Sequence, residues 1–214
     1  MSAPIDAYSK IRQGIIAGQF MPNERLLEAK LAEMLKTGRA TVRTALVRLE
    51  QEGLVELELN RGARVRLVSD AEAIELLEAR IALEKVTARY AAIRATASDK
   101  KRLETILQNM EACYKNKDFG NYSEGNKKLH QTIYEVSRHA VAGRLIDMLK
   151  AQSRRVNYRV ILMPGRPENS IEEHRGIVKA IGESNPDAAE AAVEAHLTEA
   201  LRVLKIAIEQ RLTS

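Results

Sequence analysis

The sequence of 214 residues has a formal net charge of +5, with 45% hydrophobic residues, 4% aromatic residues and no Trp. So few aromatic side chains argue against the stacking platforms of proteins that bind single-stranded nucleic acids. No apolar run approaches the roughly 20 residues needed to span a bilayer. The single cysteine, Cys113, allows no disulfide within the chain, which fits a reducing compartment. Because residues 1–13 also lack an apolar signal core, we expect a cytoplasmic protein.

The first third of the chain is predicted to hold three helices followed by a hairpin. Apolar residues recur at helical spacing up to Gly53, and the pattern then alternates as strands do, with a turn at Asn60-Arg61-Gly62. The predicted helices cover 5–18, 27–35 and 39–52, and the predicted strands cover 54–59 and 63–67. This order predicts a winged helix-turn-helix in a domain spanning 1–69.

The rest of the chain is predicted to be helical throughout. Breaks at Pro, Gly, Asn and Asp clusters separate six amphipathic segments. The predicted helices cover 71–94, 98–116, 118–137, 140–162, 169–183 and 186–211. The fold class is therefore mainly α, with an all-helical bundle as a second domain at 70–214.

Cations gather at the start of the third helix. Arg39 and Arg43 are four residues apart and share one face, so each could grip a guanine edge or a phosphate in the major groove. Ala40 and Thr41 lie between them, and Arg61 and Gly62 of the wing could approach the backbone or the minor groove. A solvated charged face is the alternative, but the position of the patch before a hairpin favours DNA binding.

Residues 12–65 resemble the N-terminal domain of the GntR family of bacterial regulators. The matching segments are Pro22-Asn23-Glu24-Arg25-Leu26, Arg39-Ala40-Thr41-Val42-Arg43-Thr44-Ala45-Leu46, Arg48-Leu49-Glu50-Gln51-Glu52-Gly53-Leu54-Val55 and Asn60-Arg61-Gly62-Ala63-Arg64-Val65. The resemblance implies a transcription regulator that recognises a double-stranded DNA operator. Four residues depart from the usual pattern: Asn23 replaces Gly, Gly38 a capping Ser, Thr41 Pro and Thr44 Glu. An altered tip of the reading helix implies a base preference different from the family norm.

Residues 71–211 resemble the FCD domain, and six helices are typical of its VanR-type subgroup. Many FCD domains bind a divalent metal through one Asp or Asn and three His. The resemblance assigns these roles to Asn126, His130, His174 and His196, which lie on three predicted helices. Such a donor set suits zinc or nickel. A lone buried His is more often a satisfied core residue, and His139 is expected to lie off the site.

The same resemblance points to a small carboxylate as the effector. Arg80 lies in Glu78-Ala79-Arg80-Ile81-Ala82-Leu83-Glu84, which resembles a motif whose Arg often faces the FCD cavity and could pair with a carboxylate. Arg155 and Arg159, four residues apart, are further candidates. Ordinary salt bridges are the alternative for all three arginines.

Three functions compete for these features. The first is a ligand-controlled regulator that binds a pseudo-palindromic operator as a homodimer. The second is a metal enzyme, but no separate acid/base pair accompanies the His residues. Glu173 adjoins His174, yet neighbouring helix residues point about 100° apart. The third, an architectural DNA binder, leaves the His residues unexplained, so we expect a regulator and not an enzyme.

Overall fold

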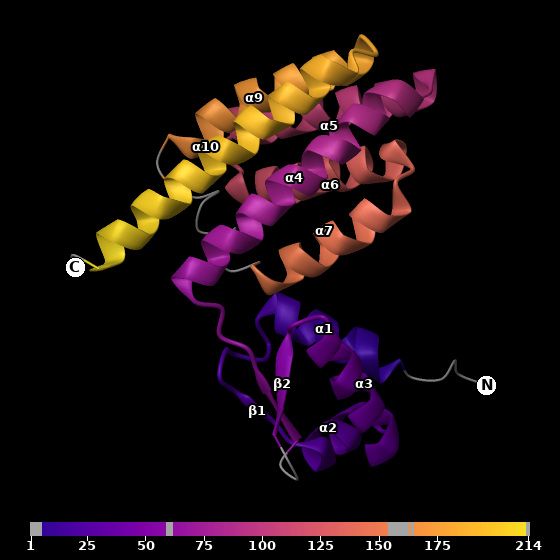
Figure 1. Ribbon diagram of the computed structural model, residues 1–214, viewed down its shortest axis with the longest axis vertical. Coiled ribbons are helices and arrows are strands. Elements are labelled where there is room, and N and C mark those ends of the chain that lie inside the picture. The colour runs from indigo at the N-terminus through magenta and orange to yellow at the C-terminus, as the bar shows by residue number, and fades with distance from the viewer. Residues whose placement is uncertain (1–5, 59–61, 154–162, 164, 213–214) are drawn as a thin grey trace. The chain divides into compact units, whose positions relative to one another are not determined.

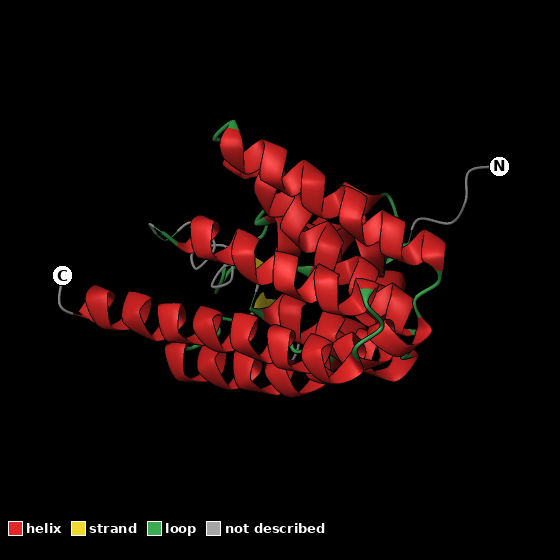
Figure 2. Cartoon of the chain, turned by 90° about the horizontal axis from the view of Figure 1, so that it is seen from above, coloured by secondary structure: helices red, strands yellow, loops and turns green. Residues whose placement is uncertain are grey.

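The computed structural model describes residues 6–58, 62–153, 163 and 165–212. The chain forms two compact units, Met1–Ser69 and Asp70–Ser214. Helices dominate both units (Figures 1 and 2), which confirms the mainly α fold class. Within the described ranges, no helix is both long enough and apolar enough to cross a membrane.

The first unit combines three helices with a small antiparallel sheet. The helices are α1 (Ala7–Ala17), α2 (Glu28–Leu35) and α3 (Arg39–Gln51), and the strands are β1 (Arg25–Leu26), β2 (Val55–Glu58) and β3 (Gly62–Val65). The sheet order is β1-β3-β2. Strand β1 was not predicted, because two residues are too few to show an alternating pattern. It pairs with β3, where Leu26 lies opposite Ala63.

Helix α3 has one buried and one exposed face. Its buried residues are Val42, Ala45, Leu46 and Leu49, and it packs against α1 and α2. The turn before it contains Lys36 in the left-handed conformation, with a φ of 52°. Gly38 then provides the N-cap without a side-chain hydrogen bond, as expected where Gly stands in place of Ser. The apolar face of α3 therefore fixes the helix and leaves its first turns exposed.

Gly62 makes a close approach possible within the sheet. Its φ is +87°, and a Cβ built on it would lie 2.3 Å from the backbone oxygen of Leu26. The sequence suggested that this Gly lets the wing approach DNA, but the close contact in the structure is to β1. The residues at the tip of the wing, including Arg61, lie outside the described residues.

The second unit is a bundle of long helices. They are α4 (Asp70–Arg94), α5 (Ala97–Lys115), α6 (Phe119–Ser137), α7 (Ala140–Gln152), α9 (Arg166–Gly182) and α10 (Pro186–Leu212). Helix α10 runs along α4 (Figure 1), and α6 packs against both α4 and α5. Helix α9 contacts α10, α5 and α4. The three helices that carry the predicted metal ligands therefore lie around α4.

Local sequence signals set most helix boundaries in this unit. Thr96 and Asp99 form a capping box at the start of α5, and the Asp118 side chain caps α6. Helix α9 begins at Arg166, three residues earlier than predicted, with Pro167 in its first turn, where a missing N–H leaves no helical bond unmade. Helix α7 ends at Gln152 with Ser153 as its C-cap, and residues 154–162 of the predicted helix 140–162 lie outside the described residues.

Candidate metal centre and DNA interface

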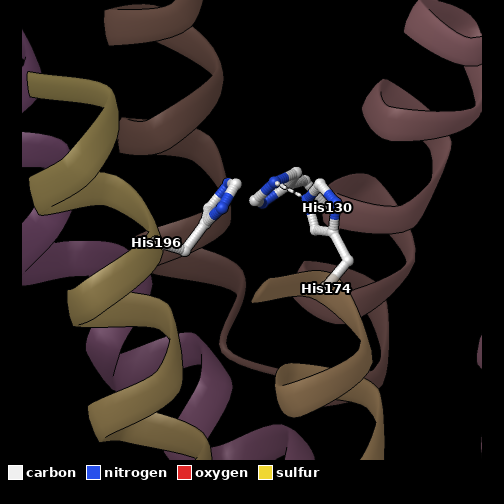
Figure 3. A group of neighbouring side chains, drawn as sticks. All are labelled: His130, His174 and His196. Carbon is white, nitrogen blue, oxygen red and sulfur yellow. Dashed lines mark hydrogen bonds between the residues drawn. The ribbon is translucent and has the colours of Figure 1, made fainter. Parts of the chain in front are cut away.

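The structure brings three of the four predicted metal ligands together. His130 of α6, His174 of α9 and His196 of α10 are all buried, and one nitrogen from each lies within 4.8 Å of the others. Figure 3 shows the three rings converging from their separate helices. The Nε2 atoms of His130 and His174 are 3.3 Å apart, close to the roughly 3.4 Å that separates two imidazole ligands of a tetrahedral zinc ion.

The outward nitrogen of each imidazole has a polar partner. These Nδ1 contacts are His130–Glu84 at 3.2 Å, His174–Ser170 at 3.3 Å and His196–Glu173 at 2.6 Å. A carboxylate favours a proton on the Nδ1 that faces it, which leaves Nε2 free to act as a ligand. Two of the three rings are therefore set in the tautomer that binds a metal, and Ser170 can accept the corresponding proton from the third.

Burial keeps the cluster neutral. Desolvation lowers the pKa of His130 below its ordinary value of 6.5, and it holds the pKa values of His174 and His196 well below 6.5. Neighbouring imidazoles add to the effect for His174 and His196. Neutral imidazole is the form that binds a metal ion, so the site is ready for an ion at neutral pH.

Asn126 adds an observation that is independent of the three His residues. It lies one helical turn before His130 on α6. Its side-chain oxygen Oδ1 is buried and has no hydrogen-bond partner within the described part of the chain. A buried amide oxygen without a donor is costly, and a bound cation would satisfy it. The donor set therefore fits a divalent ion.

Carboxylate–guanidinium pairs stand behind two of the imidazoles. Glu84, which faces His130, accepts hydrogen bonds from Arg80 Nε at 3.0 Å and Nη2 at 2.8 Å. Burial opposes the ionisation of Glu84, but Arg80 and His130 outweigh it and hold the carboxyl pKa well below its usual range. Arg80 therefore lies next to the residue that contacts His130, and its guanidinium forms a salt bridge with Glu84; its predicted role in binding an effector stays a prediction.

The second pair joins Glu173 to Arg166. Their closest atoms, Glu173 Oε2 and Arg166 Nη2, are 2.8 Å apart. The sequence did not indicate a site role for Glu84, Glu173 or Arg166. The i, i+4 spacing of Arg80 and Glu84 was a usable signal for the first pair. Glu173 and Arg166 gave none, because their partner His196 belongs to another helix.

The remaining predicted positions in the second unit fall in two places. His139 is the N-cap of α7, where its Nδ1 accepts a hydrogen bond from the Ala142 backbone N–H at 3.2 Å. It therefore lies off the cluster, as expected. Arg155 and Arg159 lie outside the described residues.

The predicted DNA-reading residues occupy the exposed start of α3. Arg39, Ala40, Thr41 and Arg43 are all exposed. Arg43 has a partner that was not foreseen, because its Nε and Nη2 donate to the two carboxylate oxygens of Glu28 on α2 at 2.9 and 3.1 Å. This pairing raises the pKa of Arg43. Glu28 thereby fixes the direction of one guanidinium on the reading face.

Comparisons with known proteins agree with both units. Residues 6–65 match the family model "Bacterial regulatory proteins, gntR family", and residues 75–199 match the FCD domain model. The chain is 28% identical to the HTH-type transcriptional repressor RspR of Escherichia coli over 192 residues, covering 90% of this chain and 84% of the relative. It is 30% identical to the Uxu operon transcriptional regulator of Escherichia coli over 210 residues, covering 87% and 80%. The solved structure of Escherichia coli McbR/YncC superimposes with a TM-score of 0.79 at 18% identity, covering 97% of this chain and all of that one.

Proposed function

The chain belongs to the GntR family of bacterial regulators and carries an FCD domain, and from that premise we propose that a small carboxylate metabolite controls its binding to operator DNA. It is a DNA-binding transcriptional regulator and not an enzyme, as its family and relatives are. The finer proposal has three parts: a metal ion in the helical domain, an effector next to that ion, and a homodimer that reads two half-sites.

The convergence of His130, His174 and His196 is the observation that carries the proposal. Three neutral imidazoles with their outer nitrogens held, together with the buried oxygen of Asn126, form a donor set for zinc or nickel. An ion bound there would supply a positive charge with coordination positions left for an anionic ligand. The four residues hold the ion, and Glu84 and Glu173 keep two of the imidazoles in the metal-binding tautomer.

The exposed start of α3 supports DNA recognition. Arg39 and Arg43 are exposed, whereas Val42, Ala45 and Leu46 of the same helix are buried. The reading surface comprises Arg39, Ala40, Thr41 and Arg43 of α3, together with Arg61 and Gly62 of the wing. In a homodimer two such helices would meet successive major grooves of a pseudo-palindrome. The effector would shift the population of dimers whose two readers fit that spacing.

The effector is proposed to be a small carboxylate. Arg80, Arg155 and Arg159 are the arginines that the sequence offers to its anionic group. The names of two relatives support the regulatory role but name no effector: one is a transcriptional repressor, and the other regulates the uxu operon.

One experiment tests the metal and its effect on DNA binding together. Protein purified without a metal column is incubated with zinc, desalted and examined by elemental analysis, and its binding to operator DNA is followed by fluorescence anisotropy. We expect one ion per chain in the wild type and a large loss in His174→Ala. His139→Ala is the matched control and should keep the ion. A wild type that carries no ion after zinc or nickel treatment would leave the three His as direct hydrogen-bonding groups for an anion.

A further inference from the structure

Arg166 has a buried nitrogen that nothing in the described chain uses. Its side chain is 4% exposed. The Nη2 atom lies 2.8 Å from Glu173 Oε2 and 3.3 Å from both the backbone oxygen and Nδ1 of His196. The Nη1 atom is buried and has no hydrogen-bond partner among the described residues. Leaving a charged donor buried and unpaired is among the more expensive features a folded protein can contain.

Arg80 provides an internal comparison for Arg166. Both arginines stand behind a carboxylate that contacts the outer nitrogen of a cluster imidazole. Arg80 uses both Nε and Nη2 on Glu84, so its side chain is explained by the support it gives to that residue. In Arg166, Nη2 makes the contacts with Glu173 and His196, and Nη1 is left without a hydrogen-bond partner among the described residues.

A metal ion cannot be the missing partner of Arg166 Nη1. Three polar atoms near the cluster are buried without a hydrogen-bond partner among the described residues: Glu84 Oε2, Asn126 Oδ1 and Arg166 Nη1. Glu84 Oε2 has His130 Nδ1 at 3.2 Å as an ion-pair partner. The other two have opposite needs, because Asn126 Oδ1 is an acceptor that suits a cation and Nη1 is a cationic donor that requires an anion. The balance of buried charge agrees. Among the described residues, the buried charged side chains are Arg80, Glu84 and Arg166, two cations and one anion, while Glu173, the partner of Arg166, is 20% exposed. A bound ion would increase that excess of positive charge.

The position of Arg166 strengthens its preference for an anion. It is the first residue of α9, at the positive end of the helix dipole. Its own backbone N–H donates to the Met163 backbone oxygen at 3.0 Å, so the guanidinium and the dipole, and not a row of free N–H groups, supply the positive charge. The N-cap is Gly165, which makes no side-chain hydrogen bond. The positive charge of Arg166 and that of the helix end therefore act at the same place.

We propose that Nη1 of Arg166 donates a hydrogen bond to a carboxylate oxygen of the effector, so that Arg166 is an effector-binding residue of this domain. The inference rests on the proposed function, because it assumes that the helical domain takes a carboxylate metabolite. A single carboxylate suits the site better than a doubly charged phosphate, since the anionic Glu173 lies against the same guanidinium. Arg166 thus holds the effector at one point and, through Glu173, supports a metal-binding imidazole at another.

The test is a ¹⁹F NMR titration of the zinc-equilibrated full-length protein with trifluoroacetate as the probe. Trifluoroacetamide is its neutral counterpart, and monofluorophosphate tests a doubly charged anion. We expect trifluoroacetate to bind the wild type more tightly than either of the other two. Arg166→Gln should weaken trifluoroacetate binding at least tenfold, and Arg166→Lys should weaken it less. Arg175→Gln is the matched control, because Arg175 lies on the same helix but is exposed and paired with Glu111 and Glu172.

The zinc content of each variant separates this inference from the proposed metal site. Arg166-dependent binding of trifluoroacetate by a protein that holds no zinc would support the role of Arg166 while removing the metal. Equal affinity of the wild type and Arg166→Gln, or a preference for trifluoroacetamide or monofluorophosphate, overturns the inference. If Arg166→Gln does not fold, a crystal structure of the wild type with trifluoroacetate decides: the carboxylate must lie within hydrogen-bonding distance of Nη1, and a carboxylate bound elsewhere contradicts the proposal.

Discussion

Glu173 on α9 lies 2.6 Å from the Nδ1 atom of His196 on α10, so a carboxylate from one helix orients an imidazole of the next. Burial raises the pKa of Glu173, and Arg166 opposes that effect. The contact gives Glu173 a role as a partner of one of the three proposed metal ligands. The Nδ1 atom of its sequence neighbour His174 has the hydroxyl group of Ser170 as its partner instead.

Replacing Glu173 by Gln should weaken metal binding by about 10–100-fold, because the carboxylate that sets the tautomer and basicity of His196 is lost. The affinity can be measured by competition for zinc with a chromogenic chelator. Glu172→Gln is the control, since Glu172 is exposed and contacts Arg175 instead. Equal zinc affinities of wild type and Glu173→Gln would show that Glu173 has no such influence.

Asn126→Asp should tighten metal binding. The substitution keeps an oxygen at the position of the unpaired Oδ1 and adds a negative charge that faces the ion. The same chelator competition measures the change, and Asn121→Asp on the exposed first turn of α6 serves as the control. A metal affinity that is unchanged or lower in Asn126→Asp would remove Asn126 from the set of ligands.

Arg80→Ala should lower the free energy of unfolding by about 3–5 kcal/mol, because it leaves the carboxylate of Glu84 buried without its guanidinium partner. The contact with His130 should keep the loss toward the lower end of that range. Urea unfolding followed by circular dichroism gives the value. Lys179→Ala removes an exposed pair with Glu183 and should change the stability by no more than about 0.5 kcal/mol.

The metal-free protein should lose stability as the pH falls below 6.5. Burial lowers the folded-state pKa values of His130, His174 and His196, so below 6.5 the unfolded chain binds protons that the folded chain does not. The free energy of unfolding should then fall by up to about 1.4 kcal/mol per pH unit for each such His. Urea unfolding of chelator-treated protein between pH 7.5 and 5.5 measures the slope. The double variant His174→Gln and His196→Gln should have a flatter slope, and an identical slope would contradict the assignment.

Arg39→Ala or Arg43→Ala should cost about 1–3 kcal/mol of operator binding if the side chain reads a base, with relaxed specificity at one position. Glu28→Ala should alter specificity mainly through Arg43, because Glu28 accepts two hydrogen bonds from that guanidinium. Fluorescence anisotropy at fixed salt measures each affinity, and Arg202→Ala on α10 is the control. Unchanged binding by both arginine variants would show that α3 is not the reading helix.

The sequence predicted the parts of the site that depend on a single helix. Asn126 and His130 are one turn apart, so any amphipathic helix at this position places them on one face. The reading helix could be predicted for the same reason, since Val42, Leu46 and Leu49 repeat at helical spacing.

Contacts between helices could not be predicted in this way. Glu173 points away from His174, as neighbouring helix residues must, and only the packing of α9 against α10 shows that it serves His196. Likewise, β1 exists because Leu26 pairs with Ala63, a partner 37 positions along the chain. Neither Arg166 nor strand β1 has a local pattern that reveals its partners.

Helix α4 begins at Asp70, the residue that follows the first unit, and carries Glu84 fourteen positions further along. At a rise of 1.5 Å per residue, this places Glu84 about 21 Å from the end of the helix that is joined to the DNA-reading unit. A continuous helix behaves as a stiff rod over that length, so a tilt of about 5° at Glu84 would move Asp70 by about 2 Å. A ligand that changed the surroundings of Glu84 and tilted α4 there would therefore displace Asp70, where the chain continues back to the wing.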